Sequence, residues 1–553
     1  MDERKTFHFH IVKFTVFSYT YRRRNQRISE RLGSAIMNYL NTCVPMKLFQ
    51  KNLDSEIYVD KSMLIEKISK KLNSADCYIC ITRPRRFGKT INANMLGAYF
   101  TKGYDTHSQF NNLSIHKTEI YEKQINQHNV IFIDFSQMPD CCKSYQEYIE
   151  NILFRLRTDL AETYPQVKEK EYSVLSQMFK DTGDSFVFIF DEWDSILYRN
   201  FMTKENKDQY LLFLKGLLKD QPYVELAYMT GVLPIVKYSS GSELNMFREY
   251  NFMNDHIYEE FFGFNEDEVK MLCQQHTEIS YEELRKCYDG YHLKDGRHLF
   301  NPRSVNAALS DGICLNYWTE TGPMNEVAEC IEHNVDVVRE DIVKMVAGIP
   351  IEVELDGYSA TELELNTRNE ILSAMLVYGF LSYYDGFLKI PNHELMEKYE
   401  SVLKRDSFGE VKAIVDSSKE MLEATLSGDE NKVASILKNV HDREIPFLKY
   451  NDENSLSCVI TLCYLYARKD YEIRREEKSG KGYCDYIFIP KKKGKTAIIL
   501  ELKVGCSCED AIKQIKDKNY MQNVKNCKEI LLVGISYDKK KHHECKIEKV
   551  RIV

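Results

Sequence analysis

A loop rich in basic residues follows an apolar run at 77–82 and precedes a helical pattern. From Arg83 to Thr90 it reads Arg-Pro-Arg-Arg-Phe-Gly-Lys-Thr. This is the phosphate-binding pattern G-x-x-x-x-G-K-[ST] with Arg83 in place of the first glycine. Such a loop directs backbone N–H groups at phosphates, while Lys89 reaches the β- and γ-phosphates and the Thr90 hydroxyl binds Mg²⁺. The predicted nucleotide-binding residues are Arg83, Arg85, Arg86, Gly88, Lys89 and Thr90.

Two adjacent acids end a second apolar run. The run at 186–190 reads Phe-Val-Phe-Ile-Phe and continues into Asp191 and Glu192. Open α/β sheets bind ligands at the carboxyl ends of their strands. We therefore expect Asp191 to hold Mg²⁺ through water and Glu192 to orient and polarise the attacking water. Adjacent acids after a strand are common, so this prediction depends on their pairing with the loop. The alternative for the loop alone is a basic surface turn.

Two further residues are weaker candidates for the same site. Thr230 ends another apolar run and is a candidate sensor of the γ-phosphate, although an ordinary strand cap explains it equally well. Arg248 is a candidate arginine finger, acting in cis or from another subunit of a homo-oligomer. Nothing in its spacing requires that role.

A second pair of acids lies near the C-terminus. The runs 483–490 and 496–503 flank a lysine-rich turn, a pattern that predicts a β-hairpin. If the turn is centred on residue 493, Asp485 lies directly opposite Glu501, and Lys503 shares a strand face with Glu501. Facing like charges destabilise a hairpin, so this arrangement favours a cation. Two carboxylates hold Mg²⁺ or Mn²⁺, which activates water, while the lysine positions the nucleophile. A charged hairpin at a sheet edge is the alternative.

The composition is that of a globular protein of several domains. The 553 residues are 43% hydrophobic and 29% charged, and a single core stops growing near about 250–300 residues. No apolar run is long enough for a membrane helix, so we expect no membrane partner. The 16 scattered cysteines are typical of a reducing cytoplasm, and Cys77 and Cys80 are expected to pack in a core.

The charge is distributed unevenly along the chain. The net charge is −8, which argues against an overall coat of basic residues for nucleic acid. Residues 471–553 carry 20 Lys and Arg against 12 Asp and Glu, a net charge of +8, which leaves −16 on the remainder. A basic C-terminal module on an acidic body indicates two separate tasks. A solvated charged face explains the basic excess alone equally well.

The elements that position these residues follow from the apolar pattern. The runs at 77–82, 130–135, 186–190 and 224–230 are continuous, as in strands buried on both faces of a parallel sheet. They predict a doubly wound α/β domain. The pattern then becomes helical, with a small wing-like hairpin at 376–384 and 387–392. From about residue 448 we expect a helix, two strands, a helix and another strand, which form a separate α/β module.

Six short motifs occur in an order that resembles the AAA-ATPase-like family of P-loop ATPases. They are Tyr58-Val-Asp-Lys-Ser62, the loop Arg83–Thr90, Phe190-Asp-Glu-Trp-Asp194, Thr230-Gly231, Tyr288-Asp-Gly-Tyr291 and Phe300-Asn-Pro-Arg-Ser304. The resemblance spans about 45–322 and implies that the loop's missing first glycine is a family habit. It also implies that Tyr288–Tyr291 lies in a helical lid with a packing role. The segment 245–250 departs from the family pattern, which puts the role of Arg248 in doubt.

The C-terminal pattern Asp485…Glu501-x-Lys503 resembles the PD-(D/E)XK nuclease superfamily. The resemblance implies that Glu453 is the acid of the first helix, and that Gln514 and Tyr520 match a Gln…Tyr pair of the RecB-like branch. It implies a restriction-endonuclease-like fold. The domains we predict are an N-terminal extension (1–45), a P-loop ATPase core (46–250), a helical lid (251–325), a helical connector (326–447) and a nuclease-like domain (448–553).

Together these features predict an ATP- and Mg²⁺-dependent ATPase joined to a metal-dependent nuclease. The predicted catalytic residues are Glu192, Asp485, Glu501 and Lys503, and the predicted metal ligands are Thr90, Asp191, Asp485 and Glu501. The expected partner of the C-terminal domain is DNA, and the architecture suggests defence or control of mobile elements. The alternative is a nucleotide-gated nucleic-acid-binding or signalling switch with an inactive nuclease fold. A remodelling ATPase without a nucleic-acid substrate is disfavoured by the basic C-terminal module.

Overall fold

The computed structural model describes residues 37–140, 142–235, 243–253, 255–318, 336–353, 367–442, 453–479, 482–492, 494–537 and 543–551. The chain divides into two compact units. The first comprises the residues up to Thr277 together with Leu293–Ser310, and the second comprises Glu278–His292 and the residues from Asp311 onward. The chain therefore passes between the units inside the segment predicted as a helical lid.

A five-stranded sheet in the order β2-β3-β4-β1-β5 forms the centre of the first unit. Its strands are β1 (Tyr78–Thr82), β2 (Asn129–Asp134), β3 (Phe186–Asp191), β4 (Val224–Gly231) and β5 (Arg248–Tyr250). Every neighbouring pair is parallel. The four predicted runs coincide with β1 to β4, so the doubly wound sheet is confirmed. The fifth strand was not predicted because its three residues, Arg-Glu-Tyr, carry no apolar run.

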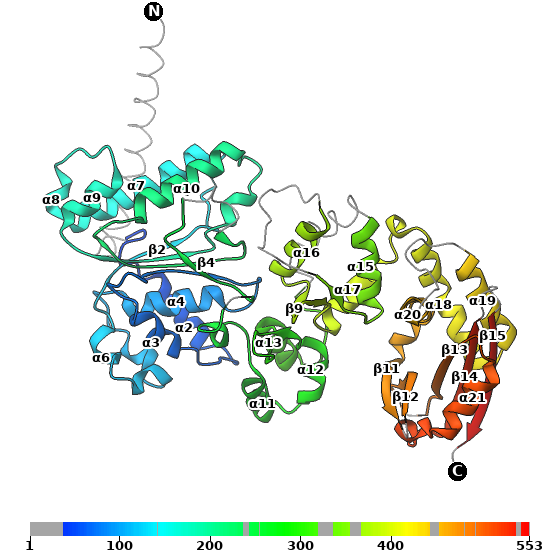
Figure 1. The fold of residues 1–553 in the computed structure, drawn as a ribbon. Coiled ribbons are helices and arrows are strands. Elements are labelled where there is room, and N and C mark those ends of the chain that lie inside the picture. Colours follow the sequence, from blue (N-terminus) through cyan, green and yellow to red (C-terminus); the bar gives the residue numbers. More distant parts are fainter. Residues whose placement is uncertain are drawn as a thin grey trace, which may run out of the picture. The chain divides into compact units, whose positions relative to one another are not determined.

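Helices cover both faces of this sheet, which explains why its strands are continuously apolar. Every residue of β3 is buried. Figure 1 shows α2, α3 and α4 on one face and α7 and α10 on the other. The helices of the unit are α2 (Val44–Leu53), α3 (Met63–Ser69), α4 (Lys89–Phe100), α5 (His107–Phe110), α6 (Tyr121–Gln124), α7 (Tyr145–Thr163), α8 (Pro165–Lys168), α9 (Leu175–Thr182), α10 (Lys204–Leu218), α11 (Glu266–Gln275) and α13 (Pro302–Asp311), with β7 at His298–Leu299.

The second unit begins with a mainly helical part that carries a small sheet. Its strands β8 (Ile351–Glu352), β10 (Phe387–Lys389) and β9 (Ser382–Tyr384) pair antiparallel in that order. The predicted wing-like hairpin is thus confirmed, and Asp385 and Gly386, both with positive φ, form the turn that such a hairpin favours. The other elements of this part are α12 (Tyr281–Tyr288), β6 (Tyr291–His292), α15 (Asp336–Val346), α16 (Arg368–Val377), α17 (His393–Val402), α18 (Glu410–Ser427) and α19 (Glu430–Asp442).

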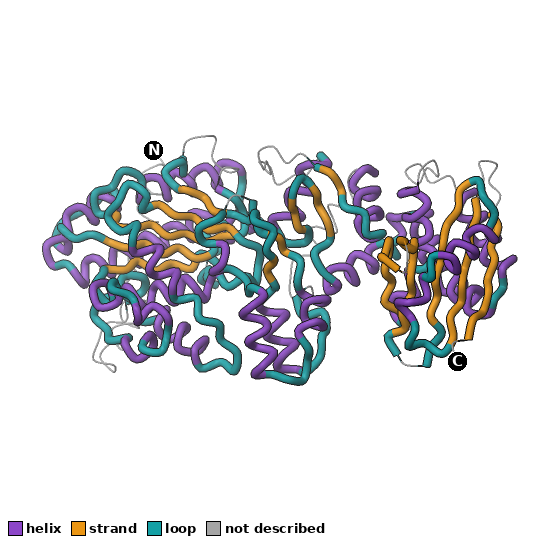
Figure 2. The backbone as a smooth tube through the Cα atoms, turned by 60° about the horizontal axis from the view of Figure 1, so that its bottom comes forward, coloured by secondary structure: helices purple, strands orange, loops and turns teal. Residues whose placement is uncertain are grey.

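The C-terminal part of the second unit contains a five-stranded sheet in the order β11-β12-β13-β14-β15. Its elements are α20 (Glu453–Cys463), β11 (Tyr471–Ser479), β12 (Gly482–Pro490), β13 (Ala497–Val504), α21 (Cys508–Asp517), β14 (Glu529–Tyr537) and β15 (His543–Arg551). Only β13 and β14 are parallel, joined through α21. The sequence missed β11 and β15, whose many charged residues hide the strand pattern. Figure 2 shows this sheet flanked by helices.

Each face of the C-terminal sheet packs against a different helix. On one face, Ser457 of α20 lies 2.5 Å from the Tyr486 hydroxyl. On the other face, Ile512 and Ile515 of α21 join the core cluster that contains Ile487. The helix α21 approaches β14 so closely that a Cβ at Gly534 would lie 2.3 Å from the carbonyl oxygen of Cys508.

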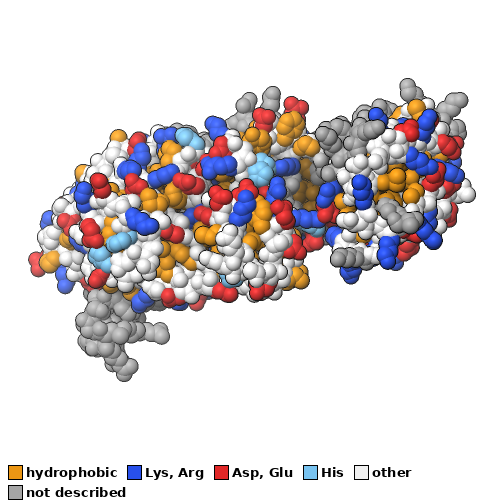
Figure 3. Space-filling model, turned by 90° about the horizontal axis from the view of Figure 1, so that it is seen from below, with side chains coloured by type: hydrophobic (Ala, Val, Ile, Leu, Met, Phe, Trp, Pro, Cys, Tyr) orange, Lys and Arg blue, Asp and Glu red, His pale blue; other side chains and the backbone are white. Residues whose placement is uncertain are grey.

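The surface carries both signs of charge. On the face shown in Figure 3, Lys and Arg side chains are interspersed with Asp and Glu. None of the helices in the described parts of the chain is both long and apolar enough to span a membrane.

Gly534→Ala is expected to destabilise the second unit by about 1–3 kcal/mol, because the added methyl group overpacks the contact between α21 and β14. The midpoint of urea unfolding, followed by circular dichroism, measures the effect. Gly216→Ala is the matched control, since a Cβ at this helical glycine would meet no atom within 4 Å, and it should be neutral or stabilising by about 0.5–1 kcal/mol. Equal stability of Gly534→Ala and the parent would contradict the close packing.

Candidate functional site

The basic loop lies at the carboxyl end of β1, as predicted. The strand ends at Thr82 and α4 begins at Lys89. Gly88 precedes the helix with φ 86°, and Arg86 adopts φ 72°, a left-handed conformation that non-glycine residues rarely adopt. The loop therefore turns sharply into α4 and leaves the side chains of Arg85 and Arg86 exposed.

Lys89 is buried at the start of α4. Its Nζ donates hydrogen bonds to the carbonyl oxygens of Arg83 and Pro84, both at 2.9 Å. Burial lowers the pKa of Lys89 to about 8, and the nearby carboxylates of Asp194 and Glu192 oppose the shift. Its ammonium group thus lies inside the turn of the loop and close to the acidic strand end.

The surroundings of Arg83 differ from those expected of a phosphate ligand, the role that the sequence suggested. Its side chain is completely buried and forms an ion pair with Asp255, which is equally buried. It also donates to the carbonyl oxygens of Thr82 and Tyr250, both at 2.9 Å. Because the guanidinium is bound by these groups in the protein interior, no described contact directs it toward a phosphate. Arg85 and Arg86 remain the exposed cations of the loop.

The acidic strand end lies beside the loop and faces Thr230. The Thr230 hydroxyl donates a short hydrogen bond to Asp191. Burial raises the pKa of Asp191 to about 6, hydrogen bonds from Thr230 and Thr90 oppose the shift, and Asp134 adds to it. The hydroxyl of Thr90 thus hydrogen-bonds to the carboxylate of Asp191. The Thr230 hydroxyl binds the Asp191 carboxylate. Its contact with a γ-phosphate stays a prediction.

Glu192 adopts an uncommon backbone conformation at the end of β3. Its φ is 49°, a left-handed value that costs about 1–3 kcal/mol in a non-glycine residue and persists where the surroundings enforce it. Its backbone N–H lies 3.5 Å from the Thr230 hydroxyl. Its half-buried carboxylate interacts electrostatically with Lys89 and Arg86. This placement suits a group that orients water near a phosphate.

Three residues near this site were not predicted from the sequence. Asp134 pairs in register with Asp191 at the end of β2. Asp194 accepts backbone hydrogen bonds from Val232 at 3.1 Å and Leu233 at 2.7 Å. Partial burial is the main cause that lowers the pKa of Arg86. Arg303, in the first turn of α13, is close enough to lower that pKa further. The apolar run at 130–135, which overlaps β2, contains Asp134 next to its last residue, much as the run 186–190 continues into Asp191, so this parallel was a usable signal.

Arg248 lies away from the loop of its own chain. It pairs with Ile79, near the start of β1, and its exposed side chain lies 5.3 Å from the centre of the Tyr250 ring. Such a position does not favour an arginine finger in cis. A contribution to the site of another subunit stays a prediction.

The second pair of acids lies where the predicted register puts it. The pairs Tyr486–Leu500, Ile487–Ile499 and Phe488–Ile498 are those of a hairpin turn centred on residue 493. At the next position, the backbone N–H of Asp485 lies 3.4 Å from Glu501 Oε2. Asp485 Oδ2 accepts a 2.7 Å hydrogen bond from the backbone N–H of Leu502.

Glu501 is the centre of this second group. Only 2% of it is exposed, and Lys503 Nζ lies 3.2 Å from its Oε1. The same oxygen accepts a short hydrogen bond from Gln514, whose amide lies 3.3 Å from the Tyr520 hydroxyl. Burial raises the pKa of Glu501 to about 7, Asp485 adds to the shift and Lys503 opposes it.

The structure therefore brings four of the predicted C-terminal residues around Glu501. These are Asp485, Lys503, Gln514 and, through Gln514, Tyr520. Glu453 begins α20, but its side chain lies outside the described residues, so its role stays a prediction. Tyr288 and Tyr291 are buried and donate to the carbonyl oxygens of Leu315 and Gly379, which fits the packing role that the resemblance implied.

Both groups supply the donors that Mg²⁺ prefers. Among the residues that can be described, His, Cys, Asp and Glu form no group of three or more suited to a metal ion. The first site instead offers the oxygens of Thr90 and Asp191, and the second offers those of Asp485 and Glu501. Mg²⁺ is commonly held by one or two carboxylates with waters and substrate phosphates. Both sets therefore fit an ion that arrives with a phosphate substrate.

Comparison with family models finds two separate matches along the chain. The model of a family described as predicted AAA-ATPase matches residues 46–240. A model of the PD-(D/E)XK nuclease superfamily matches residues 451–547. Both resemblances seen in the sequence are confirmed. No curated protein matches the chain.

Two solved structures are similar over part of the chain. The Walker-type ATPase paby2304 of Pyrococcus abyssi is 13% identical, and the match covers 61% of this chain and 94% of that one, with a TM-score of 0.31. The ORC2 protein of Aeropyrum pernix, solved as ADPNP–ADP complexes, is 12% identical, and the match covers 63% of this chain and 96% of that one, also with a TM-score of 0.31.

Thr230→Val is expected to weaken Mn²⁺ binding at the first site by about 10- to 100-fold, the usual effect of losing an outer-shell partner. Valine keeps the shape of threonine but leaves Asp191 without its hydroxyl donor. Electron paramagnetic resonance titration with Mn²⁺ and an ATP analogue measures the affinity. Thr230→Ser, which keeps the hydroxyl, should bind as the parent does. Parental affinity in Thr230→Val would show that the Thr230 hydroxyl does not help Asp191 to hold the ion.

Proposed function

We propose that this chain, which carries an AAA-ATPase-like domain and a domain of the PD-(D/E)XK nuclease superfamily, hydrolyses ATP and cleaves DNA. The convergence of Asp485, Lys503 and Gln514 on the buried carboxylate of Glu501 carries the nuclease half of this proposal. The contact between Thr90 and Asp191 beside Lys89 supports the ATPase half. A role in defence or in the control of mobile elements belongs to the proposal and rests on the domain architecture alone.

In the ATPase half, each residue has a distinct task. Lys89 lies inside the loop, where its ammonium group would contact the β- and γ-phosphates. Arg85 and Arg86 add exposed positive charge beside them. Thr90 and Asp191 would hold Mg²⁺, which neutralises the charge that develops on the transferred phosphoryl group. Glu192, held by its left-handed backbone, would orient the attacking water.

In the nuclease half, the residues divide between metal binding and proton control. Asp485 and Glu501 would hold Mg²⁺ or Mn²⁺, which supplies an activated water and stabilises the charge on phosphate. The Leu502 N–H and the Gln514 amide orient the two carboxylates, as outer-shell donors do at metal sites. Lys503 offsets the negative charge and lies close enough to Glu501 to position the nucleophile. The net charge of +8 on 471–553 would attract the phosphate backbone.

The connector is bonded directly to the C-terminal domain. Within the second unit, Arg468 donates to Glu400 at 2.6 Å and to the carbonyl oxygen of Val346 at 2.8 Å. The C-terminal domain is thereby joined by direct hydrogen bonds to α15 and α17. We propose that this connection transmits the nucleotide state. We also propose a cytoplasmic location, because cysteines such as Cys77 and Cys80 are free thiols, as is usual in a reducing compartment.

Glu501→Gln is expected to lower metal-dependent DNA cleavage by at least about 100-fold, because a metal ligand worth several kcal/mol is lost. Its ATPase rate should stay within twofold of the parent. Lys89→Ala should abolish ATP hydrolysis. The two variants are compared in parallel assays of phosphate release and of cleavage of radiolabelled DNA.

Two surface substitutions serve as controls for this pair. Glu544→Gln removes an exposed carboxylate of the second unit, and Lys117→Ala removes an exposed lysine of the first. Both should behave as the parent in both assays. Cleavage by Glu501→Gln at the parental rate would overturn the assignment of the nuclease site. ATP-dependent DNA binding with no cleavage by the parent would instead support the nucleotide-gated switch.

A further inference from the structure

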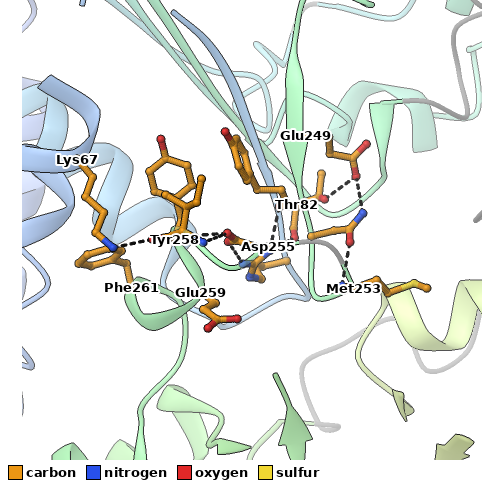
Figure 4. Close-up of polar contacts among 12 residues, drawn as sticks. Lys67, Thr82, Glu249, Met253, Asp255, Tyr258, Glu259 and Phe261 are labelled. Atoms are coloured by element: carbon orange, nitrogen blue, oxygen red, sulfur yellow. Dashed lines mark hydrogen bonds and ion pairs between the residues drawn. The ribbon is translucent and has the colours of Figure 1, made fainter. Parts of the chain in front are cut away.

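Arg83 and Asp255 form a buried ion pair beside the phosphate loop. Neither side chain has any exposed area. The rings of Phe252 and Phe262 lie 5.1 and 5.4 Å from the guanidinium carbon. Breaking a buried pair leaves an uncompensated charge, so the two residues are expected to stay together. Figure 4 shows Asp255 near the end of β1, with Thr82 and Tyr258 beside it.

Asp255 fixes the local shape of the chain that follows it. Its second oxygen, Oδ1, accepts hydrogen bonds from the backbone N–H groups of Ile257 and Tyr258, both at 2.8 Å. The carboxylate therefore closes a turn and binds Arg83 at the same time. We call residues 255–262 the clamp segment.

The clamp segment is also attached to the elements around the loop. Lys67 of α3 donates to the carbonyl oxygen of Ile257 at 2.8 Å. Asn92 of α4 donates to that of Phe261 at 2.9 Å. The clamp segment therefore binds Arg83, the first residue of the loop, and also α4, the helix that follows the loop.

The backbone of Arg83 in turn determines where Lys89 lies. The carbonyl oxygens of Arg83 and Pro84 accept the hydrogen bonds of Lys89 Nζ. The backbone N–H of Arg83 donates to Gly231, on the neighbouring strand, at 3.1 Å. Arg83 lacks the positive φ of Arg86 and Gly88, so the backbone does not require glycine here. Replacement of the first glycine costs no strain and supplies a side chain for the clamp segment.

We propose that Arg83 is a positioning residue: its ion pair with Asp255 fastens the phosphate loop to the clamp segment and keeps Lys89 in place. The inference rests on the proposed ATPase function, and it assigns Arg83 a role through Lys89 instead of a contact with phosphate. Arginine suits this position because its planar fork serves Asp255 and two carbonyl oxygens together, whereas a lysine ammonium does not match that geometry.

The test compares Arg83→Gln, Arg83→Lys and Asp255→Asn in the full chain, by steady-state ATP hydrolysis and by binding of a fluorescent ATP analogue. All three variants should lose about 10- to 100-fold in kcat, the effect of a small displacement of a catalytic group. If Arg83 were only a phosphate ligand, removal of the nearby acid in Asp255→Asn would not by itself lower kcat, so the loss of kcat in Asp255→Asn is diagnostic. Lys170→Gln, which breaks an ion pair with Asp181 at an exposed lysine of the same unit, is the control and should stay within twofold.

Hydrogen–deuterium exchange gives a second readout that needs no nucleotide. In Arg83→Gln and in Asp255→Asn, exchange should become at least about tenfold faster in both the loop and the clamp segment. If the single variants fail to fold, Arg83→Met with Asp255→Leu removes both buried charges, which proteins tolerate. That double variant should fold and show the same loss of kcat and of loop protection.

The outcomes separate the two roles of Arg83. One outcome would show that Arg83 is a phosphate ligand and would overturn the proposal. In that outcome, Asp255→Asn keeps the parental kcat and the parental loop exchange, Arg83→Gln binds ATP more weakly, and Arg83→Lys restores ATP binding. Parental kcat in the double variant would also overturn it. A parent protein that neither binds nor hydrolyses ATP would refute the proposed function alone, because the exchange measurement still decides whether Asp255 holds the loop.

Discussion

Burial of carboxylates on apolar strands is the constraint on which both sites depend: Asp191 is the last residue of β3, and Glu501 lies within β13. Asp191 and Glu501 are almost completely buried, and burial raises the pKa of each. A buried negative charge is costly unless donors or a cation compensate it. The chain supplies hydroxyls and Lys89 at the first site, and Lys503 with an amide at the second. Each arrangement is consistent with the proposed binding of a divalent cation together with a phosphate.

The parts of the fold that follow from apolar patterning were predictable from the sequence. The four main strands of the first sheet and the hairpin register around Asp485 and Glu501 both follow from runs of buried residues. The missed strands β5, β11 and β15 lie at sheet edges or carry many charges. Such strands form because they pair with a neighbouring strand, and the local sequence pattern does not reveal that pairing.

The site residues divide in the same way. Lys89, Asp191 and Glu501 belong to motifs whose spacing defines their chemistry, and the structure brings their groups together as expected. Arg83 was interpreted from its charge alone, and its partner Asp255 is distant in the sequence. A positive residue in a phosphate loop is a reasonable candidate ligand until its partner is seen. Long-range pairing of charges is therefore the information that the sequence lacked.

The central claim is that one chain holds two divalent cations, each bound by a buried carboxylate of a β-strand. Anomalous X-ray diffraction from crystals grown with Mn²⁺, a non-hydrolysable ATP analogue and a short DNA tests it most directly. The account predicts one Mn²⁺ peak bound by the Thr90 hydroxyl and, through water, by Asp191, and another in contact with Asp485 and Glu501. Crystals in which nucleotide and DNA are bound but no Mn²⁺ peak lies at Asp485 and Glu501 would contradict the account.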